Sequence, residues 1–163
     1  MEYQIVNMTA EDWKQVSDIY AAGIKTGIST FQQDIPEWCE WDNGHCKDCR
    51  LVARYKDIVV GWAALSPVSS RCVYSGVAEV SIYISPFYQS KGIGHKLLTA
   101  LVNEADEHGY WMLQAGIVRD NEKSVKLHER CGFRVVGYRE RLGQMQDGKW
   151  HDVILVEKRS SKY

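Results

Sequence analysis

The most informative pattern in the chain is Ala-Glu-Val-Ser-Ile-Tyr-Ile-Ser-Pro-Phe-Tyr-Gln-Ser-Lys-Gly-Ile-Gly-His-Lys-Leu-Leu, residues 78–98. Its alternating apolar start, closed by Pro86, predicts a strand, and the apolar spacing that follows predicts an amphipathic helix over 92–108. Between them, Gln89-Ser90-Lys91-Gly92-Ile93-Gly94 has two glycines where the strand turns into the helix. Glycine lets the backbone approach a bulky anion, and the free N–H groups of a helix's first turn point at it. The stretch therefore predicts a diphosphate-binding turn, although it is neither a Walker A sequence nor a dinucleotide fingerprint.

Periodicity and turn signals divide the rest of the chain into strands and helices. Thr9, followed by the acids Glu11 and Asp12, is typical of a helix start. We expect strands at 3–8, 50–55, 58–65, 78–84, 112–118, 133–138 and 150–157, and helices after Thr9, near 36–41, at 92–108 and at 121–130. This order predicts a mixed α/β fold in a single domain, residues 1–163.

Composition excludes several classes of protein. The 20 basic and 21 acidic residues give a formal net charge of -1, so no dominant basic field supports binding to nucleic acid or to a membrane surface. The sequence has neither a signal-peptide pattern nor an apolar run of the roughly 20 residues that a membrane span needs. Its five cysteines are an odd number, which favours reduced thiols and a cytoplasmic location.

A zinc site is the alternative for three of these cysteines. Cys46-x-x-Cys49, with Cys39 and His45 nearby, has the spacing of half a structural zinc site. No second pair follows, so we favour free thiols and expect no metal.

A second motif follows the glycine turn by about 27 residues: Asn121-x-x-Ser124-x-x-Leu127-His128-x-x-x-Gly132-Phe133. With both motifs in this order and on these elements, the chain resembles the GNAT acetyltransferases over nearly its whole length. More narrowly, it resembles the phosphinothricin and methionine sulfoximine acetyltransferase branch. The residues that match this branch are Thr30-Phe31, Glu79, Leu127-His128-Glu129 and Trp150-His151-Asp152.

The resemblance implies the GNAT fold and an acetyl-CoA cosubstrate. That fold has a central mixed, mostly antiparallel, twisted sheet of about seven strands with flanking helices, and acetyl-CoA binds where two strands splay apart. The residues expected to contact it are Ile82, Tyr83 and Ile84 along the pantetheine arm, Gln89, Ser90, Lys91, Gly92, Ile93, Gly94 and His95 at the pyrophosphate, and Asn121 near the reactive end. His95 departs from many relatives, which have Arg or a small residue there, so a cationic side-chain contact to phosphate is in doubt at neutral pH.

The resemblance also implies direct attack of an amine on the thioester. The amine must be neutral, so a general base is useful, and Glu79 matches the family's candidate. A backbone N–H of Tyr83 or Ile84 would hold the oxyanion. His128 stands where many relatives have a tyrosine, as an acid for the leaving thiolate or as a polar contact. Each has a purely structural alternative: Glu79 as a solvated strand residue, and His128 as a group that satisfies the last carbonyls of its helix.

The acceptor side of the site has fewer signals. Arg71 and Tyr74 align with an Arg and a Tyr of phosphinothricin acetyltransferases, and an arginine there would bind an α-carboxylate, unless it simply lies in water. Phe31 and Trp62 would line the pocket, and His151 either packs or contacts the substrate. The family forms dimers whose partner loops shape this pocket, so the resemblance implies a homodimer.

The function implied is therefore acetyl transfer to the amino group of methionine sulfoximine, methionine sulfone, phosphinothricin or a similar small amino acid. Two alternatives stay open: a GNAT enzyme for another amine (a polyamine, an aminoglycoside or a protein N-terminus), and a non-catalytic acetyl-CoA-binding module. Arg71 speaks against a polyamine.

Overall fold

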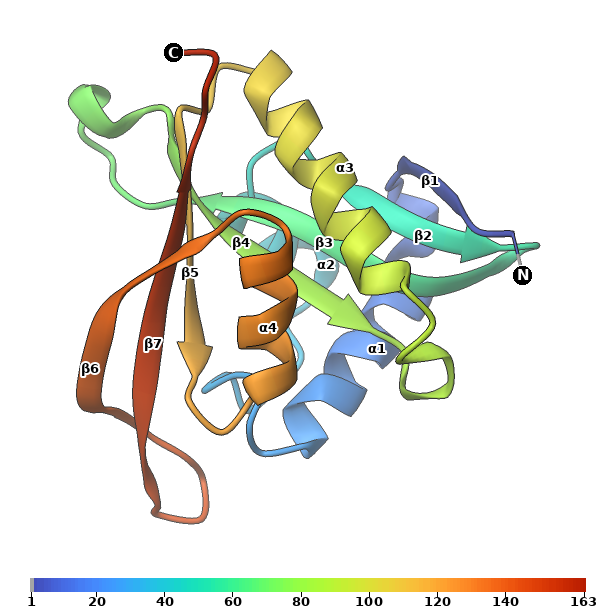
Figure 1. The fold of residues 1–163 in the computed structure, drawn as a ribbon. Helices are drawn as coiled ribbons and strands as arrows, with labels where there is room; N and C mark the ends of the chain where they lie inside the picture. Colours follow the sequence, from blue (N-terminus) through green and yellow to red (C-terminus); the bar gives the residue numbers. More distant parts are fainter. Residues whose placement is uncertain (1) are drawn as a thin grey trace.

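A computed structural model describes residues 2–163, which form one seven-stranded sheet with four α-helices (Figure 1). The strands are β1 Gln4–Asn7, β2 Leu51–Tyr55, β3 Ile58–Pro67, β4 Val77–Ile84, β5 Met112–Val118, β6 Arg134–Gln144 and β7 Trp150–Arg159. The helices are α1 Trp13–Lys25, α2 Trp38–Gly44, α3 Ile93–Glu107 and α4 Glu122–Arg130. No helix within residues 2–163 is long and apolar enough to cross a membrane.

The sheet has the strand order β1-β2-β3-β4-β5-β7-β6. Every neighbouring pair is antiparallel except β4 and β5, which run parallel and are joined through α3. The predicted mixed, mostly antiparallel sheet of about seven strands is therefore confirmed.

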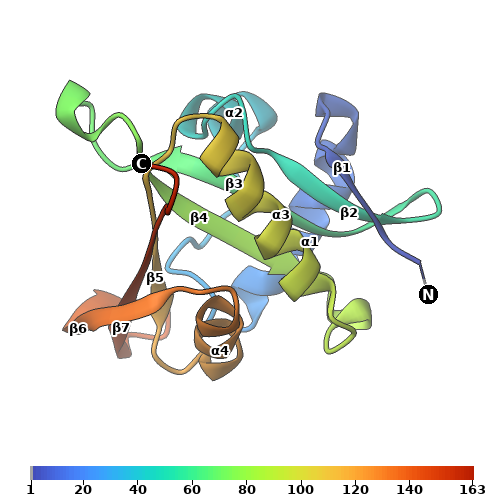
Figure 2. The same ribbon diagram turned by 45° about the horizontal axis from the view of Figure 1, so that its top comes forward.

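The helices cover both faces of the sheet (Figure 2). On one face lie α3 and α4, and the buried apolar side chains of α3, such as Leu97, Leu98 and Leu101, form one core with Ala78 and Val80 of β4. On the other face, α1 and α2 form a second core around Trp41 and Trp62. Because side chains alternate along each strand, one face of the sheet contributes to the core under α3 and α4, and the other contributes to the core around Trp41 and Trp62.

The helix and strand boundaries differ from the sequence expectation at a few places. The second helix begins at Trp38 and ends at Gly44, later than the predicted 36–41, because Pro36 precedes it rather than opening it. Strand β6 continues past the predicted end at Tyr138 to Gln144, through register shifts that break its alternation. A 3₁₀ turn at Ala10–Asp12 precedes α1, and the Asp12 carboxylate accepts the backbone N–H of Thr9 at 2.9 Å.

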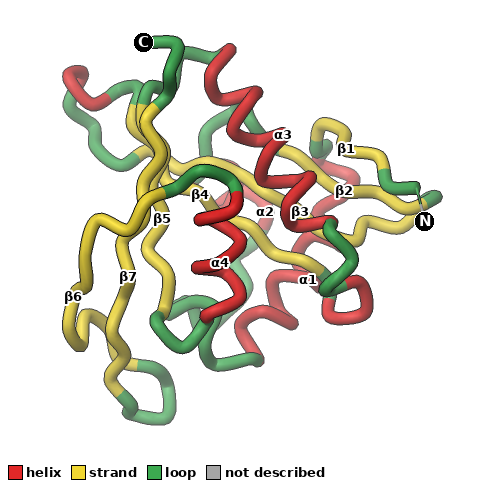
Figure 3. The backbone as a smooth tube through the Cα atoms, in the orientation of Figure 1, coloured by secondary structure: helices red, strands yellow, loops and turns green. Residues whose placement is uncertain are grey.

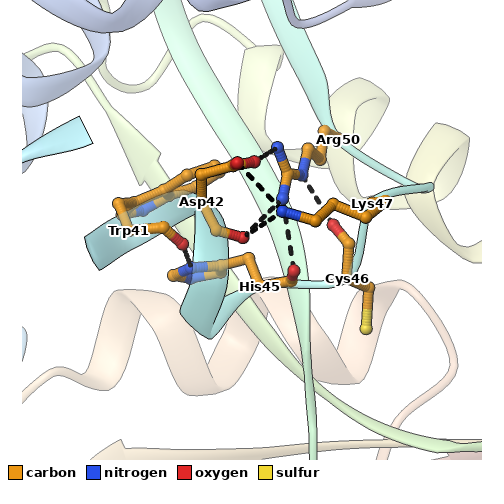
Figure 4. Close-up of polar contacts among 6 residues, drawn as sticks. All are labelled: Trp41, Asp42, His45, Cys46, Lys47 and Arg50. Carbon is orange, nitrogen blue, oxygen red and sulfur yellow. Dashed lines mark hydrogen bonds and ion pairs between the residues drawn. The ribbon is translucent and has the colours of Figure 1, made fainter. Parts of the chain in front are cut away.

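The connection from α2 to β2 is held by Arg50 (Figure 4). Its guanidinium is nearly buried, and it donates to the Asp42 carboxylate and to the carbonyl oxygens of Asp42, His45 and Cys46. Lys47 forms a second ion pair with Asp42 at 2.9 Å. Since α2 carries Trp41 into the second core, this network fixes the wall of that core next to β2.

Candidate active site

The sheet opens between β4 and β5. These strands pair at only three positions, from Val77↔Met112 to Glu79↔Gln114, whereas β4 stays paired with β3 up to Ile84↔Gly61. Figure 3 shows β4 and β5 diverging, with α4 in front of the space between them. The splayed strand pair expected from the sequence is therefore present, and its apex lies at Glu79.

The side of β4 that each backbone group faces follows from two flanking contacts. The Ser85 N–H donates to the Val60 carbonyl oxygen of β3 at 2.8 Å. The Gly76 carbonyl oxygen accepts the Trp111 N–H, on the β5 side, at 2.8 Å. Backbone groups alternate in direction along a strand. The N–H and C=O groups of odd-numbered residues of β4 therefore point toward β3, and those of even-numbered residues point toward β5.

This alternation distinguishes the two amides expected at the oxyanion site. The backbone N–H of Tyr83 points toward β3, so it is not available to a ligand in the gap. The N–H groups of Ile82 and Ile84 point into the gap, where β5 no longer pairs with them. Of the two amides expected from the sequence, that of Ile84 therefore faces the gap and that of Tyr83 faces β3.

The turn after β4 has the backbone geometry of an anion-binding site. Ser90 and Gly92 both adopt left-handed conformations, with φ of 61° and 80°, and Gly92 caps the N-terminus of α3. Successive N–H groups in such a turn converge, and the free amides of the first turn of α3 add to them. Gly94 has a different role: a Cβ there would lie 3.2 Å from Leu127 Cδ2, so its hydrogen lets α3 approach α4.

The remaining residues of this turn are divided between solvent and core. Ile93 is buried, whereas the side chains of Lys91 and His95 are exposed. The Lys91 Nζ lies 5.8 Å from the ring centroid of Tyr88. Gln89 donates from Nε2 to the Ile84 carbonyl oxygen at 3.5 Å. An anion at this turn would therefore meet the backbone N–H groups and the exposed side chain of Lys91.

The side chains of Glu79 and Tyr83 lie on the face of β4 that is turned toward α1 and α2, opposite the face that packs on α3. The Tyr83 ring belongs to the core on that side, stacks on Trp62 at 5.0 Å between centroids and fills the space over Gly23. Burial raises the pKa of Tyr83 far above its usual value, so its phenol stays protonated. Glu79 is partly exposed on the same face, as an accessible base requires.

Two residues of the α1–α2 connection lie on this face. The Thr30 side chain lies beside the phenols of Tyr20 and Tyr83; burial raises the pKa of both phenols, and Thr30 opposes that shift. The Phe31 ring lies against Gly143 of β6, at the position a side chain there would occupy. Sequence reasoning identified Phe31 but missed Tyr20 and Gly143, because a contact between a loop and a distant strand leaves no periodic signal.

His128 is buried on α4, with 2% of its surface exposed. The Ser124 carbonyl oxygen lies 2.7 Å from Nδ1, so Nδ1 bears the proton, and Nε2 is buried without a hydrogen-bond partner in residues 2–163. Burial lowers the pKa of this histidine. The neutral ring therefore offers an acceptor at Nε2, which suits a polar contact better than a donor acid.

Asn121 begins α4. Its Oδ1 accepts the Ser124 N–H at 3.3 Å, so the side chain caps the helix. It lies three residues after the end of β5, and its N–H donates to the Val118 carbonyl oxygen. The residue thus lies at the mouth of the gap, with its side-chain oxygen already engaged.

Arg71 and Tyr74 lie on the loop between β3 and β4. This loop projects away from the sheet (Figure 1), and Tyr74 and Val73 are exposed. The Arg71 guanidinium lies 5.6 Å from the Tyr74 ring centroid. Within residues 2–163, no hydrogen bond or ion pair joins either residue to Glu79, and the role of Arg71 toward a carboxylate stays a prediction.

The Trp150-His151-Asp152 segment begins β7. His151 Nδ1 lies 3.1 Å from the Asp120 carboxylate, and only 12% of the His151 side chain is exposed. Asp152 accepts the backbone N–H of Arg141 at 2.9 Å, which is the main reason that its pKa is lowered. These contacts fix the β6–β7 hairpin against the loop after β5.

The cysteines of the α2–β2 connection are free thiols. Cys49 is buried, which raises its pKa, and the His45 ring stacks on Trp41 with its Nδ1 donating to the Trp41 carbonyl oxygen. In the part of the chain that the structure describes, no group of three or more His, Cys, Asp or Glu side chains has a metal-binding arrangement.

Comparison with known proteins connects this geometry to a family. A model of the acetyltransferase (GNAT) family matches residues 13–133. The chain is 33% identical to an L-methionine sulfoximine/L-methionine sulfone acetyltransferase of Salmonella typhimurium over 107 residues, which cover 66% of the chain and 62% of that relative. It is 32% identical to a phosphinothricin N-acetyltransferase of Streptomyces viridochromogenes over 149 residues, 89% of the chain and 81% of the relative.

Solved structures agree with the sequence relatives. A phosphinothricin acetyltransferase of Sinorhizobium meliloti in complex with acetyl-CoA superposes with a TM-score of 0.88 at 26% identity, covering 98% of the chain and 89% of the other. A ribosomal-protein-alanine N-acetyltransferase of Brucella melitensis superposes with a TM-score of 0.86 at 28% identity, covering 96% and 99%. Similar folds thus serve acceptors of different size.

Proposed function

Because the chain belongs to the GNAT acetyltransferase family, we propose that it is an acetyl-CoA-dependent N-acetyltransferase acting on the amino group of a small amino acid or amino-acid analogue. The observation that supports this most directly is the opening between β4 and β5, which has Glu79 at its apex and the left-handed turn of Ser90 and Gly92 at its mouth. Relatives named for methionine sulfoximine, methionine sulfone and phosphinothricin support an acceptor of that type.

The cosubstrate fits the opening by its hydrogen-bonding groups. Amides of a pantetheine arm would pair with the free backbone groups of Ile82 and Ile84, and the pyrophosphate would accept N–H groups between Ser90 and His95. Asn121 lies at the mouth, beside the same opening. Bound acetyl-CoA supplies the activated acyl group as a thioester.

The chemistry then divides among a few groups of the chain. Glu79 accepts a proton from the ammonium group of the acceptor, directly or through water, and the neutral amine then attacks the thioester; such proton removal typically contributes on the order of 10²–10⁴ in rate. The Ile84 N–H faces the gap and stabilises the oxyanion. The leaving CoA thiolate takes a proton from water, and the Nε2 lone pair of His128 accepts a hydrogen bond from such a water.

The acceptor carboxylate needs a cation, and Arg71 is our candidate in a homodimer. The projecting loop leaves Arg71, Val73 and Tyr74 exposed in one copy. A second copy would bury this loop and bring Arg71 to the neighbouring Glu79, completing a bidentate clamp. Free thiols at all five cysteines agree with a cytoplasmic location, which we also propose.

Release of free CoA thiol from acetyl-CoA tests the function. The panel contains methionine sulfoximine, methionine sulfone, phosphinothricin, common amino acids, spermidine, an aminoglycoside and a peptide with an N-terminal alanine. We expect turnover of the first three. Turnover of the peptide, spermidine or aminoglycoside alone would overturn the acceptor class, and binding of acetyl-CoA without any turnover would favour a binding module.

A further inference from the structure

Gly143 of β6 leaves room for an aromatic ring that arrives from another part of the chain. If Gly143 carried a Cβ, that atom would lie 2.6 Å from Cε1 and Cζ of Phe31 and 2.8 Å from Cδ1. The backbone of Gly143 is not left-handed, so its conformation does not require glycine. Gly137, on the same strand, has no atom within 4 Å of the equivalent position. Glycine at position 143 therefore leaves the space that the Phe31 ring occupies.

The neighbouring residue fastens the same loop to the other half of the sheet. We call residues 26–36, between α1 and α2, the strap. Its Thr30 side chain lies beside the phenols of Tyr20 and Tyr83, whose ring centroids are 5.0 Å apart. Tyr83 belongs to β4 and Gly143 to β6, on opposite sides of the opening. Two consecutive strap residues thus bridge the two halves of the sheet.

The strap lies on the face that carries the candidate base. Glu79 pairs with Gln114, and Gln114 pairs with Glu157 of β7, so all three point to one face. Six residues before Glu157, His151 points the same way, and it pairs with Gly143. The Phe31 ring, which lies where a Gly143 side chain would be, is therefore on the same face of the sheet as Glu79.

We propose that Gly143 and Thr30 are positioning residues that hold Phe31 as a fixed wall of the acceptor pocket. The proposal deepens the proposed function and depends on it, since an acceptor pocket exists only if the chain transfers acetyl groups to a small amine. Neither residue touches the reacting atoms. Their effect is on where the Phe31 ring lies and hence on how tightly the acceptor binds.

Gly143→Ala, with Gly137→Ala as its matched control, tests the contact. The added methyl displaces the Phe31 ring, so we expect the KM for the best acceptor to rise about tenfold or more, with kcat changed much less. The Kd for acetyl-CoA stays unchanged, because the cofactor turn lies elsewhere. Gly137→Ala leaves all three constants unchanged. An acceptor KM that is the same in both variants would overturn the proposal.

A double-mutant cycle separates positioning from a structural role. In a Phe31→Ala background the ring is gone, so adding Gly143→Ala should raise the acceptor KM no further. Additive effects would contradict the proposal. At the other anchor, Thr30→Val should raise the acceptor KM while Thr30→Ser, which keeps the hydroxyl, should restore it. Equal effects of Val and Ser would remove Thr30 from the proposal.

A measurement without turnover distinguishes failure of this proposal from failure of the proposed function. The strap begins after the exposed Lys25, so its release should accelerate trypsin cleavage there in Gly143→Ala but not in Gly137→Ala. Equal cleavage rates would contradict the anchor itself. Accelerated cleavage in a protein that acetylates no amine would uphold the anchor while overturning its assignment to an acceptor pocket.

Discussion

The Nδ1 proton of His128 is donated to the carbonyl oxygen of Ser124 at 2.7 Å, and within residues 2–163 the buried Nε2 has no hydrogen-bond partner for its lone pair. A buried polar atom without a partner costs stability unless something else satisfies it. In this chain the atom lies on α4, the helix in front of the β4–β5 opening, so a bound water or ligand group is the natural partner. The arrangement makes His128 a neutral acceptor at physiological pH.

This arrangement predicts a pH-dependent difference between wild type and His128→Phe. The folded-state pKa of His128 is lowered by burial, so between its folded and unfolded values, near and below about 6.5, the unfolded chain binds more protons. Stability from this group is present above that range and is lost as the pH falls. We expect Tm to fall less between about pH 7.5 and about pH 5.5 in the variant than in wild type. Parallel curves would show that His128 titrates alike in both states.

Glu79→Gln should remove the general base while preserving shape. We expect kcat for the best acceptor to fall by about 10²–10⁴ with the Kd for acetyl-CoA unchanged, measured by thiol release and by calorimetry. Glu140→Gln, at an exposed position of β6, is the control and should behave as wild type. Unchanged kcat in Glu79→Gln would assign the base elsewhere.

Gly92→Ala should weaken the cofactor turn. Gly92 and Gly109 stand at opposite ends of α3 with φ of 80° and 86°, and at both positions a Cβ would meet no atom within 4 Å. Alanine at either site should lower the free energy of unfolding by a similar amount, about 1–2 kcal/mol, because its Cβ disfavours the left-handed conformation. Only Gly92→Ala should also raise the Kd for CoA, because Gly92 lies in the turn whose backbone N–H groups would bind the pyrophosphate and Gly109 does not. Equal Kd values in the two variants would contradict the turn as the phosphate site.

A mixing experiment tests whether Arg71 acts across a dimer. Arg71→Ala and Glu79→Gln should each have low activity alone. If Arg71 serves the partner's Glu79, unfolding and refolding the two together creates hybrid dimers with one intact site, and about a quarter of wild-type activity should return. Without sharing between subunits, the mixture stays as inactive as its parts. Light scattering at micromolar concentration should give a dimer in both cases.

Sequence patterns were sufficient for the elements in which local signals agree. The strand and helix around the glycine turn, the strand at Met112–Val118 and the helix after Asn121 were predicted nearly at their observed bounds, because apolar periodicity and glycine stops coincide there. Strand β6 was cut short at Tyr138, since beyond it the charged, bulged segment no longer alternates. Its remaining pairing depends on β7, which only the folded chain supplies.

The candidate site divides in the same way. The glycine turn and Glu79 lie in contiguous motifs, so the sequence alone predicts both as candidates. The direction of the Tyr83 amide depends on which side of β4 pairs with β3, and the Phe31–Gly143 contact joins residues that are distant in the chain. Neither leaves a trace in local composition, so the sequence alone does not distinguish the amide of Tyr83 from that of Ile84.

The early end of pairing at Glu79↔Gln114 makes the opening a wedge that is narrowest beside the candidate base. An acyl group must enter this narrow end for its carbonyl to approach an amine held at Glu79. A longer acyl chain would strike the closed part of the sheet and hold its thioester back. We therefore expect acetyl-CoA to be used in preference to butyryl-CoA and longer thioesters, with the loss appearing in kcat rather than in CoA binding. The point at which the β4–β5 pairing ends would in this way limit the length of the acyl chain that the enzyme accepts.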